Sequence, residues 1–236
     1  MLPAEAGNPD QALQLADERM YACKESSRSS AVTQTRDLAL QILAAHEPLL
    51  HEHSSHVAEL TDAVARRLGV VGAELSNAVR AAELHDIGKM AIPYAVLHKA
   101  GPLDAHDWEL MRRHPTIGAS ILGAAPALAK VAEIVGATHE RYDGGGYPRG
   151  LAGAEIPLAA RIVFVCDAFD AMIAERPFGE AMSEMQALRE LGACSGSQFD
   201  PEVIDAFMAE HAVRREARLK AHSTAPVELA RVAADG

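Results

Sequence analysis

Two aspartates, Asp86 and Asp167, interrupt segments that otherwise read as buried helices. Asp86 follows "AAEL" and His85, and Asp167 lies within "RIVFVCDAFDAMI". Neither has an Arg partner at helical spacing, and a charged carboxylate in a helical core costs several kcal/mol unless it is paired or bound to metal. A bound cation would neutralise both side chains. The two positions therefore indicate a metal site.

Four of the eleven histidines lie beside Asp, Ser or a helix boundary in apolar segments, namely His53, His85, His114 and His139. Their spacing fits no local metal motif such as H-E-x-x-H, so a shared site must be assembled from several helices. Adjacent His85 and Asp86 project about 100° apart on a helix, which lets one ion lie between them while the carboxylate reaches a second. For each histidine alone, a hydrogen-bonded or solvent-facing ring is the alternative.

The composition predicts an all-α, globular protein. The 236 residues are 49% hydrophobic, and only 4% are aromatic, which favours helix-on-helix packing. The formal charge of −11 repels nucleic acid and anionic membranes, so a phosphate-bearing ligand needs local cations. No apolar run approaches the roughly 20 residues of a membrane span. The start lacks a secretion signal, and the scattered Cys23, Cys166 and Cys194 are read as reduced thiols, so we expect a cytoplasmic location.

The elements that position these residues are expected to be helices. The periodicity predicts a helix over 10–25, a polar linker "SSRSS" at 26–30, a second helix that ends at about 46 and a third over 51–68. A fourth helix begins at about 73 and runs into the "HDIGK" segment, a fifth has Asp104 as its N-cap, and a sixth covers "AAPALAKVAEIVGATHE" and ends near His139. Three more are predicted over 158–175, 183–192 and 201–219. "RIVFVC" alone could pass for a strand, but the length of its segment argues for a helix. The Gly- and Pro-rich stretch after His139 predicts a long, shaped loop.

Three motifs then point to a family. "HDIGK" at 85–89, "HPTIG" at 114–118 and "HERYDGGGYP" at 139–148 resemble the HD-GYP branch of the HD phosphohydrolase superfamily, and the resemblance runs from about residue 36 to 210. It implies an all-helical bundle that cuts cyclic di-GMP with the help of metal ions. It also implies that one ion is held by His53, His85, Asp86 and Asp167, and the other by Asp86, His114 and His139.

The sequence departs from the family pattern at several positions. Thr138 stands where the family usually has a second histidine, and Leu49 stands where three-metal members carry a Glu. Both losses are read as removal of a third metal position, which leaves a dinuclear site. Gly179 replaces a common basic residue, which predicts looser anion binding, and His56 replaces a frequent Arg and receives no role.

Four further residues are expected to act on the substrate. Lys89 lies one turn beyond His85, where its ammonium would hold a phosphate oxygen as a catalytic and binding group; a solvated lysine is the alternative. In the "GGGYP" turn, Gly146 permits close backbone approach, and Tyr147 offers a ring for guanine and a hydroxyl donor. Arg176 matches a phosphate-gripping position of the family.

The N-terminal segment carries a second resemblance. "ALQLADERMYACKESSR" looks like the last helix of a GGDEF diguanylate cyclase domain, which implies that such a domain precedes this chain in a longer protein; an ordinary amphipathic extension is the alternative. Because an apolar stripe would otherwise be exposed, packing against the bundle or a homodimer through this helix is expected. The predicted division is a helix and linker at 1–30, the HD-GYP domain at 31–219 and a flexible tail at 220–236.

The predicted activity is hydrolysis of cyclic di-GMP to linear pGpG, or onward to GMP, by two divalent ions. Iron and manganese are expected, and the imidazole and carboxylate ligands also suit nickel, cobalt and zinc. Two rivals stay open. One is a binding module of low or no activity, favoured by Thr138 and Gly179; the other is an enzyme of the same superfamily that acts on another nucleotide or activates oxygen.

Overall fold

The computed structural model of the chain describes residues 9–174 and 181–223. Within these stretches the regular structure is helical, and the one β-bridge, between Ser195 and Phe199, is isolated. The all-α prediction is therefore confirmed. The α-helices are α1 (Pro9–His46), α2 (Pro48–Arg67), α3 (Gly72–Leu84), α4 (Tyr94–Leu97), α5 (Ala105–Met111), α6 (His114–Gly123), α7 (Ala129–Val135), α8 (Leu158–Ile173), α9 (Glu184–Ala193) and α10 (Pro201–Ser223), with 3-10 turns η1 (Ile87–Ala91), η2 (Pro126–Leu128) and η3 (Gly153–Glu155).

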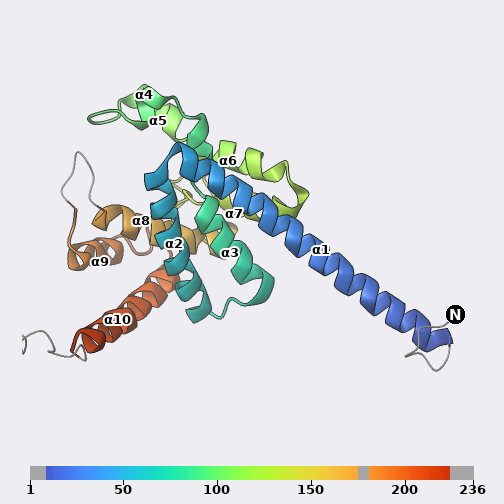
Figure 1. Cartoon of the computed structure of the whole chain (residues 1–236). Helices are drawn as coiled ribbons and strands as arrows, with labels where there is room; N and C mark the ends of the chain where they lie inside the picture. The colour runs from blue at the N-terminus through green and yellow to red at the C-terminus, as the bar shows by residue number, and fades with distance from the viewer. Residues whose placement is uncertain (1–8, 175–180, 224–236) are drawn as a thin grey trace, which may run out of the picture.

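Helix α1 is longer than the sequence suggested. The predicted linker at 26–30 is wrong, because these residues are helical and join the two expected helices into one. Serine and arginine lower helix propensity only slightly, and the stretch contains no Gly or Pro that would break a helix. The C-terminal part of α1 contacts α2, α3, η1 and η2, while its N-terminal part extends away from the other helices (Figure 1). The domain division at residue 30 stays a prediction.

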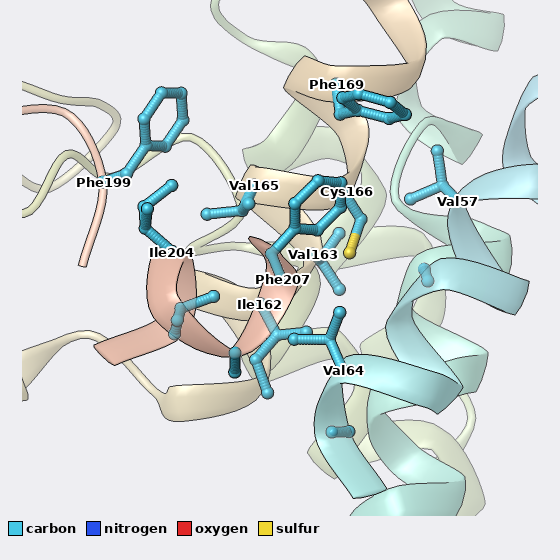
Figure 2. Packing of buried hydrophobic residues seen from close by; sticks show 14 of the residues in the cluster. Val57, Val64, Ile162, Val163, Val165, Cys166, Phe169, Phe199, Ile204 and Phe207 are labelled. Carbon is cyan, nitrogen blue, oxygen red and sulfur yellow. The ribbon is translucent and has the colours of Figure 1, made fainter. Parts of the chain in front are cut away.

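Two hydrophobic clusters hold the bundle together. In the first, apolar side chains of α8 such as Ile162 and Cys166 pack between Val57 and Val64 of α2 and Phe207 of α10 (Figure 2). The second joins α1, α3, the α6–α7 region and the start of α8. Helix α8 is apolar around much of its circumference because it contributes to both clusters, and its observed conformation excludes the strand reading of "RIVFVC".

Other boundaries follow the sequence with local differences. Asp104 caps α5 with its side chain, as predicted. The helix expected to end near His139 ends at Val135, because the chain turns at Gly136 and Ala137 N–H bonds back to the carbonyl of Ile134. The loop that follows is confirmed and contains only the short turn η3. Of the predicted tail, 220–223 continue α10 and 224–236 lie outside the described residues.

None of the described helices combines the length and apolar character that crossing a bilayer requires.

Candidate metal centre

The six candidate ligands come from five separate parts of the chain and meet in one place. Four of them follow or begin a helix: His85 and Asp86 come directly after α3, His114 is the first residue of α6, and His139 lies in the turn after α7. The other two, His53 in α2 and Asp167 in α8, lie within helices that pack against each other. Helix ends therefore supply most of the site, because a chain can change direction there and aim side chains inward.

A tight contact fixes the two helix ends relative to each other. A Cβ atom on Gly88 would lie 2.0 Å from the carbonyl oxygen of His114 and 2.6 Å from the amide nitrogen of Gly118. Such distances exclude any side chain at position 88. The "HDIGK" turn consequently lies directly on the first turn of α6, which sets His114 opposite Asp86.

The first group of ligand atoms surrounds His85. The Nε2 atoms of His53 and His85 lie 3.0 Å and 3.7 Å from Oδ1 of Asp167, and His85 Nε2 lies 3.6 Å from Oδ2 of Asp86. One ligand atom from each of His53, His85 and Asp86 lies within 4.8 Å of the ligand atoms of the other two. These atoms converge as the ligands of a single ion do.

The second group shares Asp86 with the first. Oδ1 of Asp86 lies 3.6 Å from His114 Nε2, and His114 Nε2 lies 3.0 Å from His139 Nε2. Asp86 thus directs one oxygen into each group, which is how a carboxylate bridges two ions. Around an ion with bonds of about 2.0–2.2 Å, neighbouring ligand atoms lie about 2.8–3.6 Å apart, close to the separations in both groups.

Hydrogen bonds set the orientation of three imidazole rings. Nδ1 of His85 lies 2.7 Å from the carbonyl oxygen of Ala82, and Nδ1 of His114 lies 2.8 Å from that of Met111. A carbonyl only accepts, so each Nδ1 carries the proton and each Nε2 keeps a lone pair directed at the centre. His53 is oriented in the same way by Oδ2 of Asp170, 2.6 Å from its Nδ1.

Two buried atoms of the centre lack a hydrogen-bond partner among the described residues. They are Nε2 of His85 and Oδ1 of Asp86, and both side chains are 1% exposed. Leaving a buried polar atom unpaired costs about 1–3 kcal/mol, and more for a charged group. A cation in each ligand group would satisfy both atoms, so the residues present fit a pair of metal ions.

The protonation states also suit metal binding. Burial lowers the pKa of His114 to about 4 and that of His139 to about 3, so both rings are neutral near pH 7. Burial opposes ionisation of Asp86, but Lys89 and the neighbouring imidazoles outweigh it and lower the pKa of this carboxyl. The pKa of Asp167 is likewise low, because the hydrogen bond with His53 and the nearby imidazole of His85 outweigh its burial.

Like His85, whose pKa the charge of Asp86 also raises against its burial, His53 differs from His114 and His139. Its burial disfavours the charged form, but the hydrogen bonds to Asp167 and Asp170 prevail and raise its pKa to about 9. Two carboxylates facing the same ring are the cause.

Lys89 lies elsewhere than the sequence suggested. The expected position one helical turn beyond His85 is wrong, because α3 ends at Leu84 and Lys89 belongs to the 3-10 turn η1. Its ammonium donates to Oδ2 of Asp86 over 2.6 Å, which excludes the alternative of a solvated side chain. Lys89 therefore compensates the negative charge of Asp86 at the edge of the centre.

The "GGGYP" turn packs directly on the ligand His139. A Cβ on Gly146 would lie 2.2 Å from the amide nitrogen of Arg141 and 2.6 Å from the carbonyl oxygen of His139, so only glycine fits there. The amide of Tyr147 donates to that same carbonyl over 3.1 Å, and its ring is nearly parallel to the imidazole of His139, with centroids 5.2 Å apart. Burial raises the pKa of Tyr147 to about 12, so its hydroxyl is a protonated donor.

The remaining sequence positions contribute less. Arg176 and Gly179 lie outside the described residues. The hydroxyl of Thr138 is buried and donates to the carbonyl of Val135 over 3.0 Å, so it is not directed at the other candidate ligands. His56 is exposed, with Nδ1 3.8 Å from Oδ1 of Asp170.

Sequence reasoning missed two acidic side chains. Asp170, which orients His53, lies one helical turn after Asp167 in the same apolar segment, so the burial argument applied to Asp167 could have found it. Glu140 is 1% exposed and accepts hydrogen bonds from the amides of Arg149 (2.7 Å) and Leu151 (3.0 Å). Nothing local marks Glu140, because its partners lie across a loop.

Comparison with known proteins places this site in context. The profile of the family described as HD domain matches residues 37–203. A cyclic di-GMP phosphodiesterase of Thermotoga maritima is 42% identical over 160 residues, which cover 67% of this chain and 44% of that protein. A 3'3'-cGAMP-specific phosphodiesterase of Vibrio cholerae is 35% identical over 182 residues, which cover 75% of this chain and 35% of that protein. The chain thus spans less than half the length of these curated relatives.

A solved structure shares the fold. A protein of Bdellovibrio bacteriovorus described as an HDG"Y"P protein superposes with a TM-score of 0.59 at 21% identity, covering 84% of this chain and 64% of that one.

Proposed function

The chain belongs to the HD domain family, and from this premise we propose that it hydrolyses a phosphodiester bond of cyclic di-GMP to linear pGpG, with GMP as the product of any second cleavage. The observation that carries the proposal is the position of Asp86, whose two oxygens enter two separate ligand groups. A carboxylate shared in this way is typical of dinuclear hydrolases. The substrate is taken from the relatives named for cyclic di-GMP and from the intact "GYP" turn.

The HD family is one of metal-dependent hydrolases, and two divalent ions are proposed as cofactors, iron or manganese first. Bound ions would ionise a water near neutral pH and neutralise the charge of the phosphodiester. We assign one ion to His53, His85, Asp86 and Asp167, and the other to Asp86, His114 and His139. Nickel, cobalt and zinc suit the same ligand types.

The chain's own residues would orient the substrate. The ammonium of Lys89, already beside Asp86, supplies positive charge for a non-bridging phosphate oxygen. Tyr147 offers its protonated hydroxyl as a donor, and it offers guanine the part of its ring that His139 and Arg112 leave uncovered. Gly146 keeps the loop backbone close to His139. Arg176 is retained as a proposed phosphate ligand.

Metal content and product formation test the proposal together. Freshly purified protein should contain two metal equivalents, and with Mn²⁺ or Fe²⁺ it should release pGpG from cyclic di-GMP. Asp86→Ala should lose both ions and the activity, because the shared carboxylate is removed from both groups. As a matched control, Asp205→Asn changes an exposed aspartate of α10 and should retain both. Unchanged metal content in Asp86→Ala would contradict the assignment.

A binding module is the second candidate, and the orientation of Thr138 favours it. The hydroxyl that replaces the family's second histidine bonds to the backbone and supplies no ligand atom. If this absence prevents turnover, the metal-loaded protein should bind cyclic di-GMP in calorimetry without releasing product. Because three relatives from Vibrio cholerae are named for 3'3'-cGAMP, that dinucleotide should be assayed beside cyclic di-GMP.

We also propose that α1 mediates assembly. Its N-terminal part projects from the bundle (Figure 1), where it could pair with a second copy or follow an upstream GGDEF domain. Light scattering after gel filtration should show a dimer for the full chain and a monomer without residues 1–30; a monomer in both cases would contradict the idea.

A cytoplasmic location agrees with the free, buried thiol of Cys166 and is testable by cell fractionation.

A further inference from the structure

Arg112 is a cation beside the candidate metal centre that has aromatic neighbours and, in the described part of the chain, no carboxylate partner. Its guanidinium carbon lies 5.9 Å from the ring centroid of Trp108 and 5.5 Å from that of Tyr147. The side chain is exposed, and within residues 9–174 and 181–223 no acidic group forms an ion pair with it. Its charge is therefore available to an anion.

Several other basic side chains already have carboxylate partners, which offset part of their charge. They pair with carboxylates as follows: Lys89 with Asp86, Arg141 with Asp143, and Arg161 with Asp200. The chain as a whole carries a formal charge of −11. A ligand that bears more than one phosphate consequently needs an additional unpaired cation close to the site.

The backbone places Arg112 next to the second ligand group. Helix α5 ends at Met111, Arg112 caps it, and α6 begins two residues later with His114. The ring of Tyr147, which faces the guanidinium, is also stacked on His139. One aromatic ring therefore separates this cation from the ligand His139.

The aromatic contacts suit the geometry of a guanidinium. Rings attract the flat faces of the group through their π electrons, and they hold its orientation without using its N–H donors. Those donors lie in the plane of the group, where they can bind two oxygens of one phosphate at once. A lysine at this position would keep the charge but lose both the stacking and the paired donors.

We propose that Arg112 binds the non-reacting phosphate of the cyclic dinucleotide while the other phosphate lies at the metal centre. This inference rests on the proposed function. A cyclic dinucleotide contains two phosphodiesters, and while one of them lies at the metal centre the other must be bound elsewhere. Arg112 is thus a binding residue that selects ligands with a second phosphate.

Steady-state kinetics on two substrates test the inference. Bis(p-nitrophenyl) phosphate contains one phosphodiester, and cyclic di-GMP contains two. In the metal-loaded protein, Arg112→Gln should raise KM for cyclic di-GMP about tenfold with a kcat changed less than about threefold, the signature of lost substrate binding. The ratio of kcat/KM for cyclic di-GMP to that for the small substrate should fall about tenfold, and Arg112→Lys should restore part of it.

Arg113→Gln is the matched control, because it removes the same charge one residue away, where no ring contact is present among the described residues. It should leave the ratio unchanged. An equal loss in both variants, or an equal loss on both substrates in Arg112→Gln, would overturn the inference. So would a loss for cyclic di-GMP that is absent for cyclic di-AMP, since Arg112 would then read guanine.

The same assays separate this inference from the proposed function. If the unsubstituted protein cleaves the small substrate but neither binds nor cleaves cyclic di-GMP, the proposed function fails and the role of Arg112 fails with it. If it cleaves cyclic di-GMP and Arg112→Gln does so with an unchanged KM, only the role of Arg112 is overturned.

Discussion

At the scale of single residues, the centre depends on side chains that never touch an ion. Asp170 holds the Nδ1 of His53 over 2.6 Å, so the Nε2 of that ring faces Asp167. A carboxylate in this position fixes the orientation of the imidazole and makes it a more basic ligand. Asp170 is 8% exposed, so little water competes with His53 for this carboxylate.

Asp170→Asn should therefore weaken metal binding about 10- to 100-fold without unfolding the protein. The amide keeps the shape of the side chain but removes its charge, and it can turn an N–H₂ group toward Nδ1. Metal retained after dialysis against graded chelator measures the effect, and circular dichroism checks the fold. Asp205→Asn, the exposed control, should retain metal as the unsubstituted chain does. Equal retention in both variants would show that Asp170 does not support the ligand.

At the scale of elements, the loop after α7 is held from within. Glu140 accepts the amides of Arg149 and Leu151, one on each carboxylate oxygen, so a single buried side chain closes the "GYP" loop. The amides of Tyr142 and Asp143 bond to the carbonyls of Gln198 and Ser197, which anchors the loop to the segment before α10. Although the loop is long, these hydrogen bonds hold it at both sides.

Glu140→Gln should lower the free energy of unfolding by about 1–3 kcal/mol. The substituted amide can accept only one of the two N–H groups, and its own N–H₂ must face the other at a site that is 1% exposed. Urea denaturation gives the value. Glu155→Gln is matched in chemistry, since the exposed Glu155 accepts Ala152 N–H in the same loop, and it should change stability by less than about 0.5 kcal/mol. Similar losses would show that burial is not the cause.

Elements with strong local signals were predictable from the sequence. The apolar run of α8 is too long for a strand, and Asp104 marked the start of α5. The end of α7 was not predictable, because a turn at Gly136 replaces a periodicity that continues to His139. The continuity of α1 through 26–30 was missed because polar residues are equally compatible with a linker and a solvent-facing helix.

The site divides in a similar way. Burial alone singled out Asp86 and Asp167, while the resemblance supplied the grouping of the histidines around them. Asp170 was within reach of the same argument. Glu140 and Arg112 were not, because their partners lie across loops that only the folded chain brings together.

At the scale of the whole molecule, the ligands connect the parts that the two hydrophobic clusters build. His53 and Asp167 belong to helices of the first cluster, whereas His85 and His114 begin or end helices that pack in the second. Ions bound between them would join both clusters, and unfolding would have to release these ions.

Removal of metal should consequently lower the melting temperature. Ligand at 100 times its Kd stabilises a protein by about 2.7 kcal/mol, which corresponds to about 5–10 °C for a chain of this size. Scanning calorimetry before chelation, after chelation and after reloading with Mn²⁺ measures the change. Asp86→Ala should melt at one temperature in all three conditions. If the melting temperature of the unsubstituted chain is the same before and after chelation, no structural ion is bound.

The contact between Gly88 and the backbone of His114 limits how this centre can be redesigned. Because no side chain fits between the two segments, the "HDIGK" turn and the start of α6 must shift as one body. Moving His114 to accommodate a larger cation would also move Asp86, and because Asp86 belongs to both ligand groups, the group of His53 and His85 would be disturbed as well. An engineer who wants to alter the spacing of the pair would therefore have to rebuild both segments at once.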